Sequence, residues 1–230
     1  TTPRRTGGTG GKATAMSILA VIFDMDGVLI DSEPVYLYHD WEQLRGRYPW
    51  ITPESLYPTV GMASQDYPRF MARLCRRDND VAFAEELSQI GAACQVFYPD
   101  ILRPQVRPLL ARLRAMGLQI ALASSSALVN IRRVLTECEL TEAFDVVVSG
   151  EAFTRSKPDP EIYQYTMAQL GRTPAECLIV EDSTYGVQAG AAAGGVVAAL
   201  RDDRFPFDQS AARFHLEQLA DIPQLLAELE

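Results

Sequence analysis

The sequence contains very little lysine. Of its 21 Lys and Arg residues, only Lys12 and Lys157 are lysine, and every other basic position is arginine. The net charge of −9 also means that the chain lacks the basic excess with which proteins hold nucleic acid or anionic membranes. We therefore expect neither as a partner. A local site can still be positive in an acidic protein, so a small anionic substrate remains compatible with this composition.

Cysteine pairs and long apolar runs are also missing. The four cysteines are scattered, with no pair at C-x-x-C spacing, which argues against a zinc or redox motif. Isolated free thiols are typical of a reducing cytoplasm, where we expect the protein to act. No run of residues is apolar enough to span a membrane. Residues 1–15 are rich in Gly and Thr and lack the apolar segment of a signal peptide, so we interpret them as a tag remnant or disordered leader.

What the chain does contain is a regular alternation of short apolar runs and helix-like stretches. This alternation predicts an α/β fold, a Rossmann-like parallel sheet with helices on both faces. Strands are expected at residues 18–23, 118–123, 144–148, 178–180 and 196–200. Helices are expected at 106–116 with Gly117 just beyond, at 128–138, at 185–193, from 222 onward, and after Asp159 as N-cap with Pro160 as first residue.

Residues 34–103 have a different character. They are rich in Tyr, Trp and Arg, are punctuated by prolines, and show helical spacing with little strand signal. We predict an α-helical cap domain here, inserted after the first strand, and an α/β core formed by residues 16–33 and 104–230. Ligands of parallel sheets bind beyond the carboxyl ends of the strands, so the cap should lie above that edge.

The first strand ends in D-M-D-G, which places Asp24 and Asp26 two residues apart. Most such matches, taken alone, are solvated acidic turns. As a functional pair, Asp24 can attack phosphorus while Asp26 protonates the leaving oxygen and later takes a proton from water. Gly27 would let the backbone turn tightly and bring its N–H groups near an oxyanion.

A second acidic pair, Glu181 and Asp182, ends another predicted strand. Gathering these carboxylates near Asp24 is unfavourable unless a cation is present. Mg²⁺ fits, because it prefers carboxylates, waters and phosphate oxygens as ligands. We predict Asp24 and Asp182 as direct ligands and the main-chain carbonyl of Asp26 as a third, with Glu181 supporting the site from outside the ligand set.

A run of serines follows the strand that ends at Ser124. The Ser124 hydroxyl and the neighbouring backbone N–H groups could hold phosphate oxygens. We include Ser125 with it as a substrate contact. For Ser125 and Ser126, a helix N-cap role in a serine-rich turn is an equal alternative.

These strand-end motifs resemble those of the haloacid dehalogenase superfamily. F-D-M-D-G-V, the strand ending in Ser124, K-P-D-P and L-I-V-E-D-S-T-Y-G occur in that family's order and spacing. D-S-E-P at 31–34 is similar to the subfamily of small-molecule phosphatases and β-phosphoglucomutases with a helical cap. The resemblance implies these roles: Asp24 as nucleophile, Asp26 as general acid and base, Ser124 and Lys157 as phosphate contacts, and Asp182 as magnesium ligand.

Within the family, the residues favour a phosphatase. Dehalogenases lack the second aspartate, and phosphonatases require a cap lysine, which residues 34–103 do not contain. β-Phosphoglucomutases have a histidine where this chain has Tyr36 and a cap arginine where it has Ser64. We predict a magnesium-dependent phosphatase that acts as a monomer on a small phosphomonoester, such as a sugar or polyol phosphate, through an aspartyl-phosphate. A phosphosugar mutase is the alternative, and a non-catalytic binder of a phosphorylated ligand is less favoured.

The cap is expected to determine specificity. Candidate side chains are Tyr36, Tyr38, Trp41, Arg45, Arg47, Tyr67, Arg69 and Arg73. For any one of them, packing or solvation is the favoured interpretation. His39 and His215 stand alone in the sequence and are interpreted as packing or surface residues rather than ligands.

The single lysine outside the leader, Lys157, has a physical rationale. Lysine is a compact point charge on a flexible stem, whereas arginine is a wide planar fork. A site that already holds a metal ion, several carboxylates and a phosphoryl group has little room for a fork. Lys157 can instead touch both Asp24 and a phosphate oxygen with one ammonium group, so replacing it by arginine should strongly reduce turnover.

Overall fold

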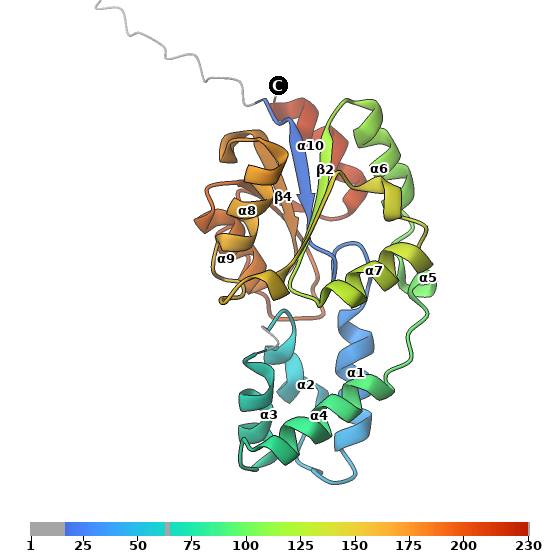
Figure 1. Ribbon diagram of the computed structural model, residues 1–230, viewed down its shortest axis with the longest axis vertical. Helices are drawn as coiled ribbons and strands as arrows, with labels where there is room; N and C mark the ends of the chain where they lie inside the picture. The colour runs from blue at the N-terminus through green and yellow to red at the C-terminus, as the bar shows by residue number, and fades with distance from the viewer. Residues whose placement is uncertain (1–16, 63–64, 230) are drawn as a thin grey trace, which may run out of the picture.

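The computed structural model describes residues 17–62 and 65–229. Within them, six strands form one sheet in the order β3-β2-β1-β4-β5-β6, and all neighbouring strands are parallel (Figure 1). The strands are β1 (Ala20–Phe23), β2 (Gln119–Ser124), β3 (Val146–Ser149), β4 (Cys177–Glu181), β5 (Val196–Leu200) and β6 (Phe214–Leu216). The predicted α/β fold with a Rossmann-like parallel sheet is confirmed. The predicted leader and Ser64 lie outside the described residues.

Strand β1 lies in the middle of the sheet because it is apolar along its whole length. All of its residues are buried. Its side chains alternate, so Val21 and Phe23 pack into the hydrophobic cluster on one face, and Ala20 and Ile22 into the cluster on the other. Its parallel neighbours are β2 and β4, so the carboxyl ends of these three strands lie at the same edge of the sheet.

Helices cover both faces of the sheet, as predicted. One face is covered by α6 (Val106–Ala115), α7 (Leu128–Glu137) and α10 (Ile222–Leu229), and the other by α8 (Glu161–Leu170) and α9 (Thr184–Ala192) (Figure 1). Gly117 follows α6 with a φ of 81°, the left-handed conformation expected just beyond a helix end. None of the helices in the described ranges is long and apolar enough to cross a membrane.

Two local predictions are corrected. Helix α8 begins at Glu161, with Pro160 in the N-cap position, so the predicted start lies one residue too early. The Asp159 carboxylate still accepts a hydrogen bond from the Glu161 N–H at 3.1 Å, which stabilises this helix end. The short edge strand β6 was not predicted, because three residues that include the exposed His215 leave little periodicity to detect.

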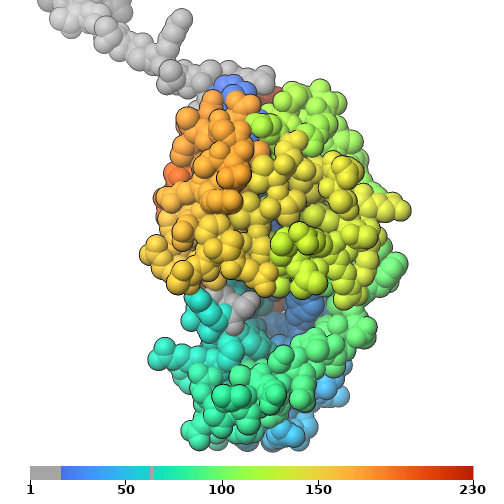
Figure 2. Space-filling view, in the orientation of Figure 1, coloured from blue at the N-terminus to red at the C-terminus, as the bar shows by residue number. Residues whose placement is uncertain are grey.

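The residues between β1 and α6 are mainly helical, and residues 33–101 are called the helical segment below. They form α1 (Glu33–Leu44), α2 (Pro53–Leu56), α3 (Tyr67–Cys75), α4 (Val81–Ala93) and α5 (Tyr98–Ile101). Figure 1 places α1 to α4 beyond the carboxyl edge of the sheet, where they pack around a hydrophobic cluster of their own. Tyr98 of α5 belongs instead to the cluster on one face of the sheet. Figure 2 shows that the molecular surface narrows between the helical segment and the sheet.

A loop from the sheet reaches into the helical segment. Phe205, between β5 and β6, is buried within the hydrophobic cluster of α1 to α4. Its ring stands edge-on to Tyr57 at a centroid distance of 5.7 Å. This contact ties the loop after β5 to the helical segment.

Candidate active site

Three carboxylates meet at the carboxyl edge of the sheet. Asp24 follows β1 directly, while Glu181 ends the neighbouring strand β4 and Asp182 follows it. One carboxylate oxygen from each lies within 4.8 Å of the others, and all three residues are buried. Burial is the main reason that the pKa of Asp24 is raised to about 8, although Lys157 opposes the shift. A nearby cation would therefore favour the ionised form of Asp24 near neutral pH.

Lys157 supplies the positive charge at the centre of this cluster. Its Nζ donates to Asp24 Oδ1 at 2.6 Å, to Glu181 Oε1 at 2.7 Å and to the carbonyl of Ala123 at 3.1 Å. Burial alone would lower the pKa of Lys157, but the two carboxylates outweigh burial and the pKa is raised well above its usual value. All three ammonium donors are thus directed to acceptors that converge on one point, a geometry that a planar guanidinium does not match.

Both oxygens of Glu181 are used by protein groups. Oε1 accepts from Lys157 and from the Tyr163 hydroxyl at 2.6 Å, and Oε2 accepts from the Asp182 N–H at 3.0 Å. A Cβ placed on Gly186 would lie 1.9 Å from Glu181 Oε1, so glycine at this position lets α9 approach the carboxylate. Glu181 thus orients Lys157, and each of its oxygens already accepts a hydrogen bond from a protein group.

Asp182 differs from Glu181 in this respect. Its Oδ2 atom is buried, and no hydrogen-bond partner for it occurs in the described part of the chain. Burial, followed by the charges of Glu181, Glu33 and Asp24, raises its pKa well above the usual range. An unpaired buried oxygen among clustered carboxylates fits a hard cation such as Mg²⁺, for which Asp24 and Asp182 offer the appropriate oxygen ligands.

Gly27 makes the tight turn that the sequence predicts. Its N–H donates to the Ile30 carbonyl at 2.9 Å, so this amide is engaged within the turn and is not available to hold a substrate oxygen. Its φ is 76°, and a Cβ here would lie 2.0 Å from Asp182 Oδ2. Glycine is therefore needed for the left-handed turn and for the close approach of Asp182.

Asp26 is held by two serine hydroxyls. Ser32 donates to Oδ1 and Ser126 to Oδ2, both at 2.7 Å. Burial raises the pKa of Asp26, although these two hydrogen bonds act against the shift. Ser126 therefore has a contact that the sequence left open, and Ser32 was missed, although both lie in motifs that the sequence displays. The buried Ser124 hydroxyl accepts from the Ser126 N–H at 3.1 Å and so shapes the same turn.

A cavity of about 170 Å³ opens over these groups. It is lined by the predicted residues Asp24, Asp26, Ser124, Ser125, Lys157 and Asp182. The lining also includes Glu33, Tyr36 and Ser126. Ser126 donates to Asp26, and the side chains of Glu33 and Tyr36 come from α1 and lie near the Asp26 charge. Glu33 was not predicted; burial among carboxylates raises its pKa well above the ordinary value, and the D-S-E-P motif was the available signal.

The candidate specificity residues separate into two groups. Tyr36 lines the cavity, and Arg69 and Arg73 border an adjoining hollow of about 240 Å³ that reaches Lys157. The others contact neighbours within the helical segment: Tyr38 and Arg45 lie against Trp41, Arg47 pairs with Glu86, and Tyr67 donates to Asp40. His39 contacts the Ile90 carbonyl at 2.8 Å, and His215 is an exposed residue of β6, so neither lines the cavity.

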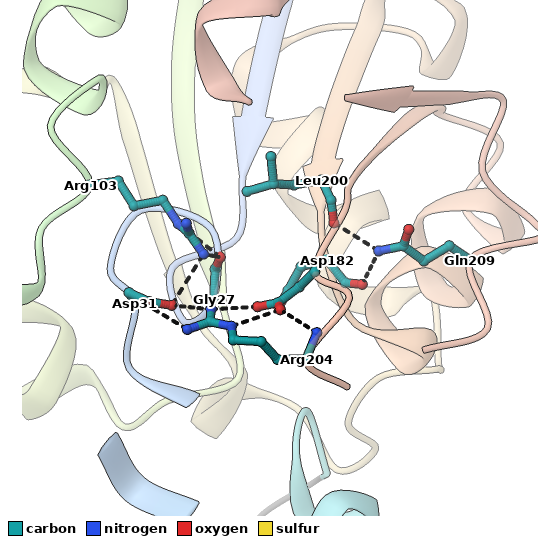
Figure 3. A network of polar contacts seen from close by, with 8 residues as sticks. Gly27, Asp31, Arg103, Asp182, Leu200, Arg204 and Gln209 are labelled. Carbon is teal, nitrogen blue, oxygen red and sulfur yellow. Dashed lines mark hydrogen bonds and ion pairs between the residues drawn. The ribbon is translucent and has the colours of Figure 1, made fainter. Parts of the chain in front are cut away.

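A polar network joins the two connections to the helical segment (Figure 3). Arg103, after α5, donates to the Gly27 carbonyl at 2.8 Å and to Asp31, before α1, at 3.3 Å. Arg204 donates to Asp31 from the loop that follows β5. Gln209 in the same loop donates to the Asp182 carbonyl at 2.5 Å. The backbone carbonyls of Gly27 and Asp182 are thus each held by a side chain from a distant part of the chain.

Comparison with known proteins agrees with this site. The chain belongs to the haloacid dehalogenase-like hydrolases, whose family pattern matches residues 18–194. It is 31% identical over 194 residues to a phosphorylated carbohydrates phosphatase of Thermotoga maritima, covering 80% of this chain and 88% of that one. It is 34% identical over 185 residues to hexitol phosphatase B of Escherichia coli, covering 79% of this chain and 82% of that one.

A solved structure shares the fold. The crystal structure of a haloacid dehalogenase family hydrolase from Deinococcus radiodurans, with bound phosphate and sodium, superimposes with a TM-score of 0.73 at 26% identity. The match covers 93% of this chain and 97% of that one. The prediction that the chain is a phosphoric monoester hydrolase of this family is confirmed by the family match and the two phosphatases.

Proposed function

We propose that the protein is a magnesium-dependent phosphatase that hydrolyses a small sugar or polyol phosphate through an aspartyl-phosphate. The observation that carries the proposal is the 2.6 Å contact between Lys157 Nζ and Asp24 Oδ1 at the floor of the cavity, beside the unpaired Asp182 oxygen. It supports the proposal because the carboxylate that would attack phosphorus, the cation that would lie beside the phosphate and the oxygen that would hold a metal ion are close together. We also propose that residues 34–103 form a cap over a core of residues 16–33 and 104–230.

The chemistry follows from the positions of two aspartates. Asp24 attacks phosphorus in line, and the bond to the leaving alcohol breaks as Asp26 gives that oxygen a proton. Burial raises the pKa of Asp26, which favours the protonated carboxyl needed at this point. Ionised after that transfer, Asp26 then takes a proton from water, which attacks phosphorus, frees Asp24 and releases inorganic phosphate.

Charge on the transferring phosphoryl group is stabilised from several sides. The Lys157 ammonium lies beside Asp24, so its positive charge would act on the phosphoryl group, and a direct hydrogen bond to a phosphoryl oxygen would replace one of its three present acceptors. Ser124 and Ser125, with the N–H groups of their turn, contact the phosphoryl oxygens. Magnesium, when bound, would be held by Asp24, Asp182 and the main-chain carbonyl of Asp26, and would neutralise the carboxylates and the phosphate.

The substrate class rests on the size of the cavity and on the relatives. A cavity of about 170 Å³ fits a small metabolite rather than a phosphoprotein segment. The two phosphatases that the chain resembles are named for phosphorylated carbohydrates and hexitols. A phosphosugar mutase is the second candidate, because the same core chemistry serves it, but Tyr36 stands where the mutases have histidine. The predicted monomeric state and cytoplasmic location belong to the same proposal.

Hydrolysis of p-nitrophenyl phosphate tests the activity. We expect turnover with Mg²⁺, loss of turnover with EDTA, and a loss of about 10⁴-fold or more in Asp24→Asn, which removes the nucleophile. Asp78→Asn, the same change at an exposed site, is the matched control. Absence of turnover on every member of a panel of sugar and polyol phosphates would contradict the proposal. Conversion of β-glucose 1-phosphate to the 6-phosphate would instead establish the mutase.

A further inference from the structure

Tyr36 lies in the wall of the cavity that faces Asp26. It is on α1, one helical turn after Glu33, and both side chains line the cavity. The Asp26 charge is the second cause, after burial, of the raised pKa of Tyr36. Because Asp26 is the proposed proton donor to the leaving alcohol, the part of the substrate nearest Tyr36 is the alcohol rather than the phosphate.

The hydroxyl of Tyr36 belongs to a chain of hydrogen bonds that leads away from the cavity. Its oxygen is 3.2 Å from the Tyr98 hydroxyl, which in turn donates to Asn130 Oδ1 at 2.6 Å. A phenol has a single proton. Since Tyr98 gives its proton to Asn130, the Tyr98 oxygen accepts from Tyr36, and the Tyr36 proton points away from the cavity.

The partners of Tyr36 are well fixed. Tyr98 is 3% exposed, and the Arg133 guanidinium lies 5.0 Å from the centre of its ring. Arg133 is itself held by a hydrogen bond to the Val96 carbonyl at 2.8 Å. Asn130 lies on α7, which packs on the sheet. The direction of the Tyr36 proton is therefore set by the core of the protein and does not depend on the substrate.

We propose that Tyr36 selects phosphate esters whose alcohol carries a further hydroxyl close to the ester oxygen, by accepting a hydrogen bond from that hydroxyl. This inference rests on the proposed phosphatase function and refines its substrate class. An ester without that hydroxyl leaves the Tyr36 oxygen without a donor. An ester that bears a carboxylate in that place sets its lone pairs against those of Tyr36.

Two substrates that differ in a single hydroxyl give the direct test. Hydroxyethyl phosphate carries a hydroxyl next to the ester carbon, and ethyl phosphate does not. We expect wild-type kcat/KM to favour hydroxyethyl phosphate by about tenfold or more, because a site built to accept a hydroxyl proton rejects the analogue without one. In Tyr36→Phe we expect this ratio to fall by about tenfold. A ratio that changes by less than about twofold overturns the proposal.

Further variants test whether the direction of the Tyr36 hydroxyl proton, and not only the presence of that hydroxyl, determines the ratio. Tyr98→Phe frees the Tyr36 proton to turn toward the cavity, so we expect a lower ratio and a gain of phosphoglycolate turnover relative to hydroxyethyl phosphate. Asn130→Asp keeps an acceptor for Tyr98 and should preserve the ratio. The exposed Tyr38→Phe, on the same helix, is the matched control and should also preserve it.

The outcomes distinguish the two proposals. An unchanged ratio in Tyr98→Phe, with circular dichroism showing a folded protein, would refute the role of the hydrogen-bond chain. If wild-type protein hydrolyses phosphomonoesters but shows no preference between the two substrates, the inference about Tyr36 fails and the phosphatase proposal stands. If it hydrolyses no phosphomonoester, the phosphatase proposal itself fails.

Discussion

The carboxyl edge of the sheet and the helical segment use charged side chains in opposite ways. At the edge, Lys157, Asp24 and Glu181 are buried and pair at 2.6 and 2.7 Å. In the helical segment, the ion pair between Arg47 and Glu86 lies at the surface, where such pairs contribute little to stability. Burial makes each contact at the edge sensitive to a change of a single atom, whereas exposure makes the helical segment tolerant.

This difference suggests a division of tasks. In the proposed function, the strand ends hold the groups that react, because their positions are determined by backbone pairing within the sheet. The helical segment packs around a separate cluster and contributes only a few side chains, such as Tyr36, to the cavity. On this proposal, chemistry depends on the strand ends, and substrate selection depends on a part that can vary without disturbing them.

Among the changes that compare the two regions, the largest effect is expected at the buried cation. Lys157→Arg retains the charge, but the guanidinium cannot place its donors on Asp24, Glu181 and the Ala123 carbonyl at once. We expect kcat on p-nitrophenyl phosphate to fall by about 100-fold or more. The control is Arg155→Lys in the same loop, where the side chain is 71% exposed, and kcat should change by less than about twofold. Near-normal turnover in Lys157→Arg would refute the argument from shape.

A second prediction concerns the fit of α9 against the edge. Gly186→Ala places a Cβ 1.9 Å from Glu181 Oε1, and Glu181 cannot move without giving up Lys157 and Tyr163. We expect the free energy of unfolding to fall by about 1–3 kcal/mol, measured by urea denaturation. Wild-type stability in this variant would mean that the edge relaxes more readily than its contacts indicate.

The third prediction uses pH. The pKa values of Asp24, Asp26 and Asp182 are all raised, that of Asp24 to about 8, so the folded protein binds more protons than the unfolded chain. These groups stabilise the fold fully below their unfolded pKa values near 4, and the contribution is lost as pH rises through the folded values. The raised pKa of Lys157 keeps that residue charged throughout this range.

In EDTA we therefore expect Tm to fall by about 4 °C or more between about pH 5 and about pH 8. Mg²⁺ should reduce this dependence, because the cation replaces the protons on the carboxylates. Differential scanning calorimetry at matched ionic strength measures how steeply Tm depends on pH in EDTA and in Mg²⁺. Asp182→Asn, which removes one carboxylate, should lower the slope in EDTA and weaken the response to Mg²⁺. A Tm that rises with pH in EDTA would contradict this account.

The smallest effect is expected in the helical segment. Gly91→Ala makes the same change as Gly186→Ala, but a Cβ at position 91 meets no atom within 4 Å in the described part of the chain. Alanine is the better residue in the interior of α4, so we expect stability to rise by about 0.5–1 kcal/mol in the same urea experiment. A rise in the free energy of unfolding in Gly91→Ala with a fall in Gly186→Ala would support the comparison. Equal falls in both variants would contradict it.

Much of the fold and of the site was predictable from local signals. β1, β2, β4 and β5 are runs of buried apolar residues, and each is long enough to be recognised. The acidic and serine residues at their ends follow from the chain itself. β6 is too short for its pattern to be seen, and the start of α8 depends on how the Asp159 side chain turns back to cap it.

The contacts of individual side chains were less predictable. Which serine touches Asp26 depends on the path of the turn after β2, and the answer is Ser126, with Ser32 arriving from the start of α1. Gly27 was predicted to present an amide, but its N–H closes the turn and its missing side chain makes room for Asp182. Each of these outcomes requires two segments to be placed relative to one another.

The parallel sheet, the polar groups at the strand ends and the importance of Lys157 could be inferred from the sequence by itself. Periodicity and charge are properties of neighbouring residues, so they are visible without the tertiary structure. Only the tertiary structure decided that Glu181 contacts Lys157, that an oxygen of Asp182 has no hydrogen-bond partner among the described residues, and that the Tyr36 hydroxyl lies beside that of Tyr98. Such facts depend on distances of a few ångströms between residues far apart in the chain, and packing alone sets those distances.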